Sequence, residues 1–107
     1  MGKITIQYLS DVKARLNSLV FILYEKEYFS FLESSYDYVD RLIEFIDNDL
    51  INFPHKQTPE KLIRFGSKYV FYKANNHTTW YIFFETKDNR YLITYITNNH
   101  TEDAKFL

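Results

Sequence analysis

The segment from Lys68 to His100 reads KYVFYKANNHTTWYIFFETKDNRYLITYITNNH and is dominated by aromatic and β-branched residues. Residues of these types favour strands, and two polar stretches divide the segment into three runs. Both stretches are rich in asparagine and aspartate, which tolerate the left-handed dihedrals of tight turns. The segment therefore predicts an antiparallel meander with strands at Lys68 to Ala74, Thr78 to Glu85, and Arg90 to Thr97.

The tetrapeptide NNHT occurs twice, at residues 75–78 and 98–101. The first copy lies at a predicted hairpin turn, whereas the second ends the last strand and begins a polar tail, HTEDAKFL. Because these contexts differ, we interpret the two copies as an echo between neighbouring strands and not as a repeat architecture, which normally needs at least three units.

The N-terminal half predicts one strand and two helices. Ile4, Ile6 and Tyr8 alternate with polar residues, which indicates a short strand. Apolar residues then recur at helical spacing from Val12 to Leu23, so residues 11 to about 27 predict an amphipathic helix.

A second helix is predicted to begin at a capping box formed by Ser30 and Glu33. Its apolar stripe continues to Leu50, and Pro54 ends it because proline disfavours helical dihedrals in the residue before it. The predicted fold class is α+β: a strand, a two-helix antiparallel hairpin and a three-stranded antiparallel meander, with both helices on one face of the sheet. The other face is expected to be partly open and to carry Tyr81, Phe83 and Glu85.

Composition limits the remaining possibilities. The chain has 107 residues, two glycines and two prolines, which predicts one domain over residues 1–107 without a flexible linker. No run of 18 apolar residues or signal peptide is evident, so a cytoplasmic protein without membrane contact is expected. There is no cysteine, and the three histidines lie 22 and 23 residues apart, so neither a metal site nor another cofactor is expected.

The element order, the Pro59-Glu60-Lys61-Leu62 connection, the strand pair TTWYIFFE and RYLITYITNNH, and the polar cluster after the last strand resemble the RelE/ParE superfamily of bacterial toxins. The resemblance covers nearly the whole chain. It implies a small cytoplasmic toxin that is held inactive by a cognate antitoxin. One branch of that superfamily cleaves messenger RNA on the ribosome, and the ParE-like branch inhibits DNA gyrase.

The resemblance also implies candidate site residues. Glu60 matches the glutamate that nuclease members often carry in this connection, and His100 matches the histidine or tyrosine after their last strand. Metal-independent RNA cleavage needs a base, an acid and cations at the phosphate. The expected catalytic residues are His100, Glu60 and Lys73, and the expected RNA-binding residues are Arg64, Lys68, Arg90 and Tyr81.

Two alternatives remain open. The arginine that active members usually carry near the start of the penultimate strand has no counterpart at Thr78, Thr79 or Trp80, and the sequence pI is about 6.3. Both features favour a non-catalytic binding protein of the same fold, because each phosphate contact depends on a cation. The other alternative is a homodimer formed through two apolar stripes on the second helix, Tyr38, Leu42 and Phe45 beside Tyr36, Val39, Ile43 and Ile46.

Overall fold

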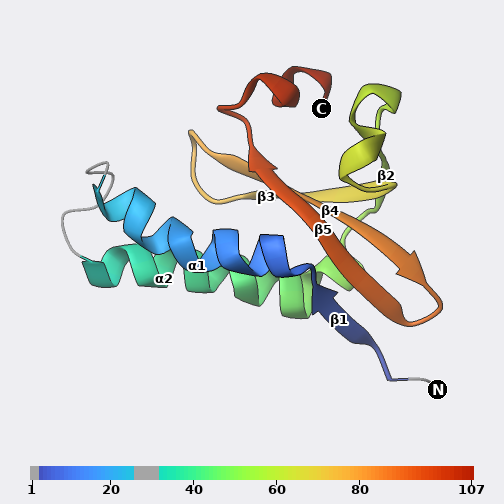
Figure 1. Ribbon diagram of the computed structural model, residues 1–107, viewed down its shortest axis with the longest axis horizontal. Coiled ribbons are helices and arrows are strands. Elements are labelled where there is room, and N and C mark those ends of the chain that lie inside the picture. The colour runs from blue at the N-terminus through green and yellow to red at the C-terminus, as the bar shows by residue number, and fades with distance from the viewer. Residues whose placement is uncertain (1–2, 26–31) are drawn as a thin grey trace.

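The computed structural model describes residues 3–25 and 32–107 and contains a five-stranded sheet with two long helices (Figure 1). Four short helical turns connect or extend these elements: η1 (Phe45–Asp49, a π turn), η2 (Leu50–Asn52), η3 (Glu60–Phe65) and η4 (Glu102–Phe106). The strands and long helices are β1 (Thr5–Tyr8), α1 (Ser10–Glu25), α2 (Leu32–Glu44), β2 (Lys56–Gln57), β3 (Lys68–Lys73), β4 (Thr79–Lys87) and β5 (Arg90–Asn98).

The predicted meander is present as β3, β4 and β5, but the sheet is larger than that meander. Its strand order is β1-β5-β4-β3-β2. β1 lies parallel to β5, with Thr5 opposite Arg90, and β2 adds an antiparallel edge beside β3. The sequence did not predict β2 because its two residues, Lys56 and Gln57, are polar and exposed and show no apolar alternation.

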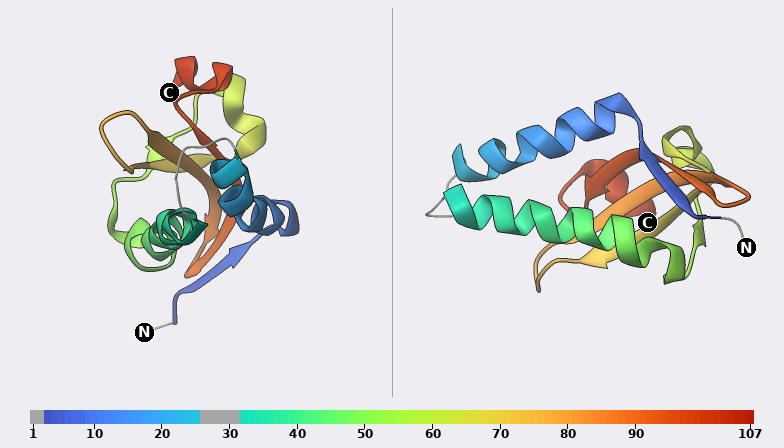
Figure 2. Two further views of the ribbon diagram at one scale, coloured as in Figure 1. Left: turned by 90° about the vertical axis from the view of Figure 1, so that its left-hand side faces the viewer. Right: turned by 90° about the horizontal axis from the view of Figure 1, so that it is seen from below.

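Both helices pack on one face of the sheet, as expected (Figure 2). Residues Val12 and Leu16 of α1 and Leu42 of α2 share a buried cluster with Trp80 and Ile82 of β4. The far part of the hairpin extends beyond the sheet (Figure 1). No helix within the described residues is long and apolar enough to cross a membrane.

The helical segment of α2, η1 and η2 ends near the predicted residue, but its last part is not regular α-helix. Regular α-helix stops at Glu44, and η1 and η2 carry the helical turns on to Asn52. Phe53 is extended before Pro54, as the proline requires. The capping box predicted at Ser30 and Glu33 lies outside the residues whose side chains the structure describes.

The stripes proposed for a homodimer serve the chain's own core. Leu42 and Ile46 are fully buried, Val39 and Phe45 are nearly so, and only Tyr36 of these seven residues is strongly exposed. The second helix therefore does not present the two apolar stripes that a dimer interface on this helix requires.

The face away from the helices is more covered than the sequence predicted. η3 and η4 lie over it, and Phe83, expected to be exposed, is completely buried beside Leu62 and Phe65. The Phe65 ring stacks on that of Tyr95, with ring centroids 3.9 Å apart. The polar tail forms the 3₁₀ turn η4, and Phe106 and Leu107 at its end pack against this second cluster.

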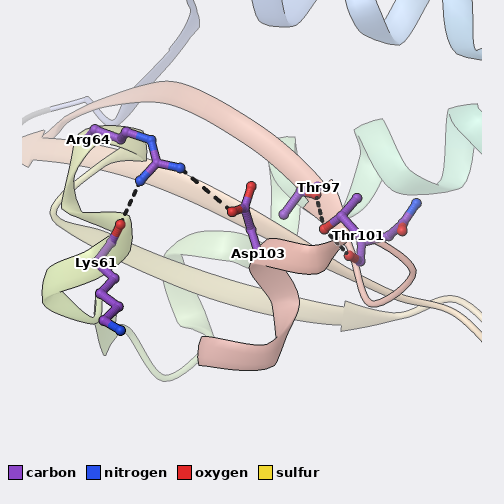
Figure 3. A network of polar contacts seen from close by, with 6 residues as sticks. Lys61, Arg64, Thr97, Thr101 and Asp103 are labelled. Carbon is purple, nitrogen blue, oxygen red and sulfur yellow. Dashed lines mark hydrogen bonds and ion pairs between the residues drawn. The ribbon is translucent and has the colours of Figure 1, made fainter.

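Arg64 joins η3 to η4 (Figure 3). Its Nη1 donates a hydrogen bond to the Lys61 carbonyl over 2.6 Å, and its Nη2 lies 3.6 Å from Oδ1 of Asp103. The same guanidinium lies over the Phe65 ring, 4.3 Å from its centroid. Arg64 thus holds the two turns together, and its predicted RNA contact stays a prediction.

A β-bulge between β4 and β5 sets which residues of β5 face the helices. Phe83 is opposite Tyr95 and Phe84 is opposite Ile93, so Thr94 is the additional residue. Ile93 and Ile96 are an odd number of residues apart and in a regular strand would face opposite sides. The bulge lets both enter the cluster beneath the helices.

Candidate functional site

The two NNHT copies form one hydrogen-bonded unit at the end of the sheet. Oδ1 of Asn75 accepts hydrogen bonds from the backbone amides of His77 and Thr78, and Oδ1 of Asn98 accepts one from the amide of His100. In both copies the first asparagine thus closes an Asx turn onto the histidine two residues later.

Asn99 joins the two copies. Its Oδ1 accepts a hydrogen bond from the amide of Thr79 over 3.0 Å, and its Nδ2 donates one to the carbonyl of His77 over 3.0 Å. Nε2 of His100 lies 3.1 Å from Oγ1 of Thr78. The His100 ring is therefore anchored by the other copy of its own tetrapeptide.

A cavity of about 400 Å³ separates this unit from the helical hairpin. We call it the His100 cavity. Trp80 forms part of its wall, and the Trp80 Nε1 donates a hydrogen bond to the Tyr38 hydroxyl over 2.8 Å. Burial raises the pKa of Tyr38 above its ordinary value. The lining residues are Arg15, Leu19, Ile22, Leu23, Tyr38, Asn75, Thr78, Trp80, Asn98 and His100.

The predicted catalytic residues are divided between the two faces of the sheet. His100 lines the cavity on the helix side. Glu60 begins η3, which packs on the opposite face through Leu62. Lys73 alternates with the partly buried Tyr72, which packs on the helix side, so Lys73 faces the other side as well.

The predicted RNA-binding residues are also dispersed. Arg90 begins β5 and lies about 27 Å along that nine-residue strand from its His100 end. Lys68 is opposite Phe84, which places it on the helix side, whereas Tyr81 lies on the side of Lys73. Of the seven predicted site residues, Lys73 and Tyr81 are the pair that strands β3 and β4 bring to one surface.

That surface has a hollow of about 280 Å³ with aromatic walls. Tyr69, Phe71 and Tyr81, which we call the aromatic face, lie on neighbouring strands, with the centroids of the Tyr69 and Tyr81 rings 6.1 Å apart. Phe71 is 41% exposed, whereas Tyr69 is buried at 8% and forms the floor beneath the other two. Nζ of Lys56 lies over the Phe71 ring at 5.6 Å from its centroid. Burial, together with the nearby Tyr81, raises the pKa of Tyr69.

Sequence reasoning missed two cations that line these hollows. Lys56 belongs to the short strand β2, whose contact with β3 no local pattern indicates. Arg15 lies on the exposed side of α1, where an arginine is ordinarily a solvated residue. The alternation of Tyr69, Phe71 and Lys73 was, by contrast, a usable signal for the aromatic face.

No protein family model, curated protein or solved structure matches this chain. Within residues 3–25 and 32–107 the structure holds no group of three histidine, aspartate or glutamate side chains placed to bind a metal ion.

Proposed function

We propose that this chain is a toxin-like component of a bacterial toxin–antitoxin module, of RelE/ParE type, that binds single-stranded RNA without cleaving it. The observation that carries the proposal is the aromatic face with a lysine at each side, Lys56 and Lys73. Aromatic side chains accept unpaired bases by stacking, and cations beside them contact the phosphates. This function places the protein in the cytoplasm.

The charge of the chain is compatible with such a surface. A net charge of -1 gives little general attraction to RNA, so affinity must come from local contacts. The C-terminal half, which contributes the aromatic face, carries eight Lys or Arg against five Asp or Glu. Stacking is sequence-tolerant, so we expect weak, salt-sensitive binding with little base preference.

The separation of the predicted catalytic groups supports binding without cleavage. His100 is the expected acid, but it lines a cavity on the helix side, while Glu60 and Lys73 belong to the opposite side. Proton transfer requires acid and base within hydrogen-bonding reach of the same phosphate. A single RNA strand on the aromatic face does not meet that requirement for His100.

A RelE-like, metal-independent endoribonuclease is the second candidate, and one observation favours it. Lys73 is opposite Thr79, and the Thr79 amide donates a hydrogen bond to Asn99, the neighbour of His100. Lys73 and His100 therefore lie at the same end of the sheet. A strand of RNA that bends around this end would contact both residues.

The test measures RNA binding and cleavage together, using a fluorescent single-stranded oligoribonucleotide with purified protein in EDTA. Phe71→Ala is expected to weaken binding about tenfold, since one stacked base contributes about 1–3 kcal/mol. Lys73→Ala should reduce the slope of log affinity against log salt by about 1. Arg90→Ala, at the far end of β5, is the matched control and should bind like the parent protein.

The outcomes separate the candidates. Equal binding by the parent, Phe71→Ala and Lys73→Ala proteins contradicts the RNA proposal, and growth arrest in cells without RNA loss would then favour a protein target such as DNA gyrase. RNA cleavage that His100→Ala abolishes supports the endoribonuclease. Binding without cleavage supports our leading proposal.

The proposed antitoxin needs a surface on this chain, and we propose the protruding part of the hairpin. Phe21 and Tyr36 are 49% and 45% exposed, and their rings meet edge to face at 6.2 Å. Exposed aromatic pairs of this kind are common anchors in protein interfaces. Phe21→Ser together with Tyr36→Ser should abolish copurification with a coexpressed antitoxin, whereas Arg90→Ala should not.

A further inference from the structure

The His100 cavity is rich in hydrogen-bond donors. The Asx turns engage the side-chain oxygens of Asn75 and Asn98, and because backbone amides can only donate, each asparagine must present its Nδ2 donor elsewhere. Neither Nδ2 group has a hydrogen-bond partner among the described residues. The repeated NNHT motif thus leaves two amide donors at one cavity.

A positive charge also lines this donor-rich cavity. Arg15 lines the cavity, and its guanidinium makes no ion pair or hydrogen bond with any residue that the structure describes. Its Cζ lies 5.6 Å from the centroid of the Tyr95 ring, which belongs to the second cluster. His100 has one ring nitrogen engaged by Thr78 and the other free of described partners. No aspartate or glutamate is among the lining residues.

The remaining wall of the cavity is apolar. Leu19, Ile22 and Leu23 from α1 line it together with Trp80. A volume of about 400 Å³ lies in the usual range of small-molecule sites. A ligand that fits both walls has an acceptor-only head and an apolar body.

We propose that the His100 cavity binds a small amphiphilic anion, with a carboxylate or phosphate head at Arg15, Asn98 and His100 and an alkyl or ring body against Leu19 and Leu23. An anionic head supplies acceptors to Arg15, to the Nδ2 donor of Asn98 and to a ring N–H of His100, and the planar fork of Arg15 suits two oxygens of one head. This site is on the helix side, so it is distinct from the aromatic face and does not depend on RNA binding.

Trp80 provides the measurement because it is the single tryptophan of the chain. The folded protein is titrated with octanoate, octyl phosphate and octanol, and Trp80 fluorescence and the heat of binding are followed. We expect saturable binding of one or both anions, with octanol at least about tenfold weaker because it carries no charge. Tighter octyl phosphate identifies a phosphomonoester ligand, and tighter octanoate identifies a carboxylate.

Two variants test the donors directly. Asn98→Asp keeps an oxygen for the His100 amide but replaces the free Nδ2 donor with negative charge, and it should weaken binding of either anion about tenfold or more. Arg15 lies on the exposed side of α1, and Arg15→Gln should also weaken the binding of either anion about tenfold or more. This substitution breaks no described polar contact. Arg90→Ala, at the far end of β5 and outside the lining of the cavity, is the control and should bind like the parent.

Three results would overturn the proposal: octanol binding as tightly as the anions, no binding of either anion by the folded parent protein, or undiminished affinity in both Asn98→Asp and Arg15→Gln. The first would indicate a groove for an apolar segment of another protein. RNA affinity is measured on the same samples. Asn98→Asp should leave it unchanged, so failure here is distinguishable from failure of the RNA proposal.

Discussion

Oγ1 of Thr78 lies 3.1 Å from Nε2 of His100, so two identical tetrapeptides meet side by side. The register of the sheet explains the meeting. Trp80 is opposite Asn98 in the antiparallel pair of β4 and β5. Residue 78 precedes Trp80 by two positions and residue 100 follows Asn98 by two positions, so residues 78 and 100 lie side by side. The two copies are not repeats of a fold unit, but they are a structural pair, which sequence analysis did not predict.

Asn99 should be the stabilising member of this pair. Asn99→Ala removes hydrogen bonds to the Thr79 amide and the His77 carbonyl, so we expect the free energy of unfolding to fall by about 1–2 kcal/mol. Asn76 occupies the same position in the other copy and is exposed without a described hydrogen bond, so Asn76→Ala is the matched control. Urea denaturation of both variants is the measurement, and equal losses would contradict the assignment.

Gly66 should not tolerate a side chain. A Cβ at this position would lie 2.5 Å from Oγ1 of Thr94, 3.0 Å from the backbone nitrogen of Phe84 and 3.1 Å from Cβ of Phe83. The Thr94 hydroxyl also donates a hydrogen bond to the carbonyl of Phe65, so the bulge and the end of η3 are joined at this point.

Gly66→Ala is therefore expected to lower the free energy of unfolding by about 2 kcal/mol or more, because backbone must move to relieve the contact. Thr94→Ala in the same chain should recover only part of the loss, since the contacts with Phe84 and Phe83 remain. Thermal unfolding of the single and double variants checks this. Full recovery in the double variant would show that the threonine hydroxyl alone excludes the side chain.

Local sequence patterns sufficed to predict those strands and helices whose own residues show alternation or apolar periodicity. The three meander strands alternate or are bounded by turn residues, and the helices show apolar periodicity, so their positions were predictable. β2 was not, because Lys56 and Gln57 become a strand only through pairing with β3. The burial of Phe83 was equally unpredictable, since it depends on turns η3 and η4 that lie on either side of the meander in sequence.

The sequence named residue types suited to a site, but it did not show which of them lie together, and it did not single out Arg15 or Lys56. His100, Glu60 and Lys73 have suitable chemistry, yet which face a side chain occupies depends on strand register and on the bulge at Thr94. The cavity depends further on Arg15, which comes from a helix distant in sequence. Neither strand register nor the position of Arg15 relative to His100 can be predicted from local sequence patterns.

Ser35 provides a site where stability should increase. Its hydroxyl is completely buried in α2 and has no hydrogen-bond partner within the described part of the chain. Ser35→Ala removes this unsatisfied group and gains helix propensity, so the free energy of unfolding should rise by about 1 kcal/mol. Ser34→Ala is the control for helix propensity alone. It should raise the free energy of unfolding, measured by urea denaturation, by about 0.5 kcal/mol. A loss of stability in Ser35→Ala would mean that the hydroxyl is paired in solution.

Tyr8 should make stability depend on alkaline pH. Burial, and after it the 2.6 Å hydrogen bond to the carboxylate of Asp47, raises the pKa of Tyr8. The unfolded chain releases this proton near pH 10, where the folded chain retains it, so the free energy of unfolding falls as pH rises above about 10. Below pH 10 the Tyr8 contribution is fully present.

Tyr8→Phe should lower the free energy of unfolding at pH 7 by about 1–2 kcal/mol, because a hydrogen bond to a charged group is lost. Above pH 10 its stability should decline less steeply than that of the parent, so the two curves converge. Asp47→Asn keeps the acceptor oxygen and should retain most of the stability at pH 7. Denaturation midpoints between pH 7 and pH 11 provide the comparison, and parallel curves for parent and Tyr8→Phe would show that Tyr8 is not the group that titrates.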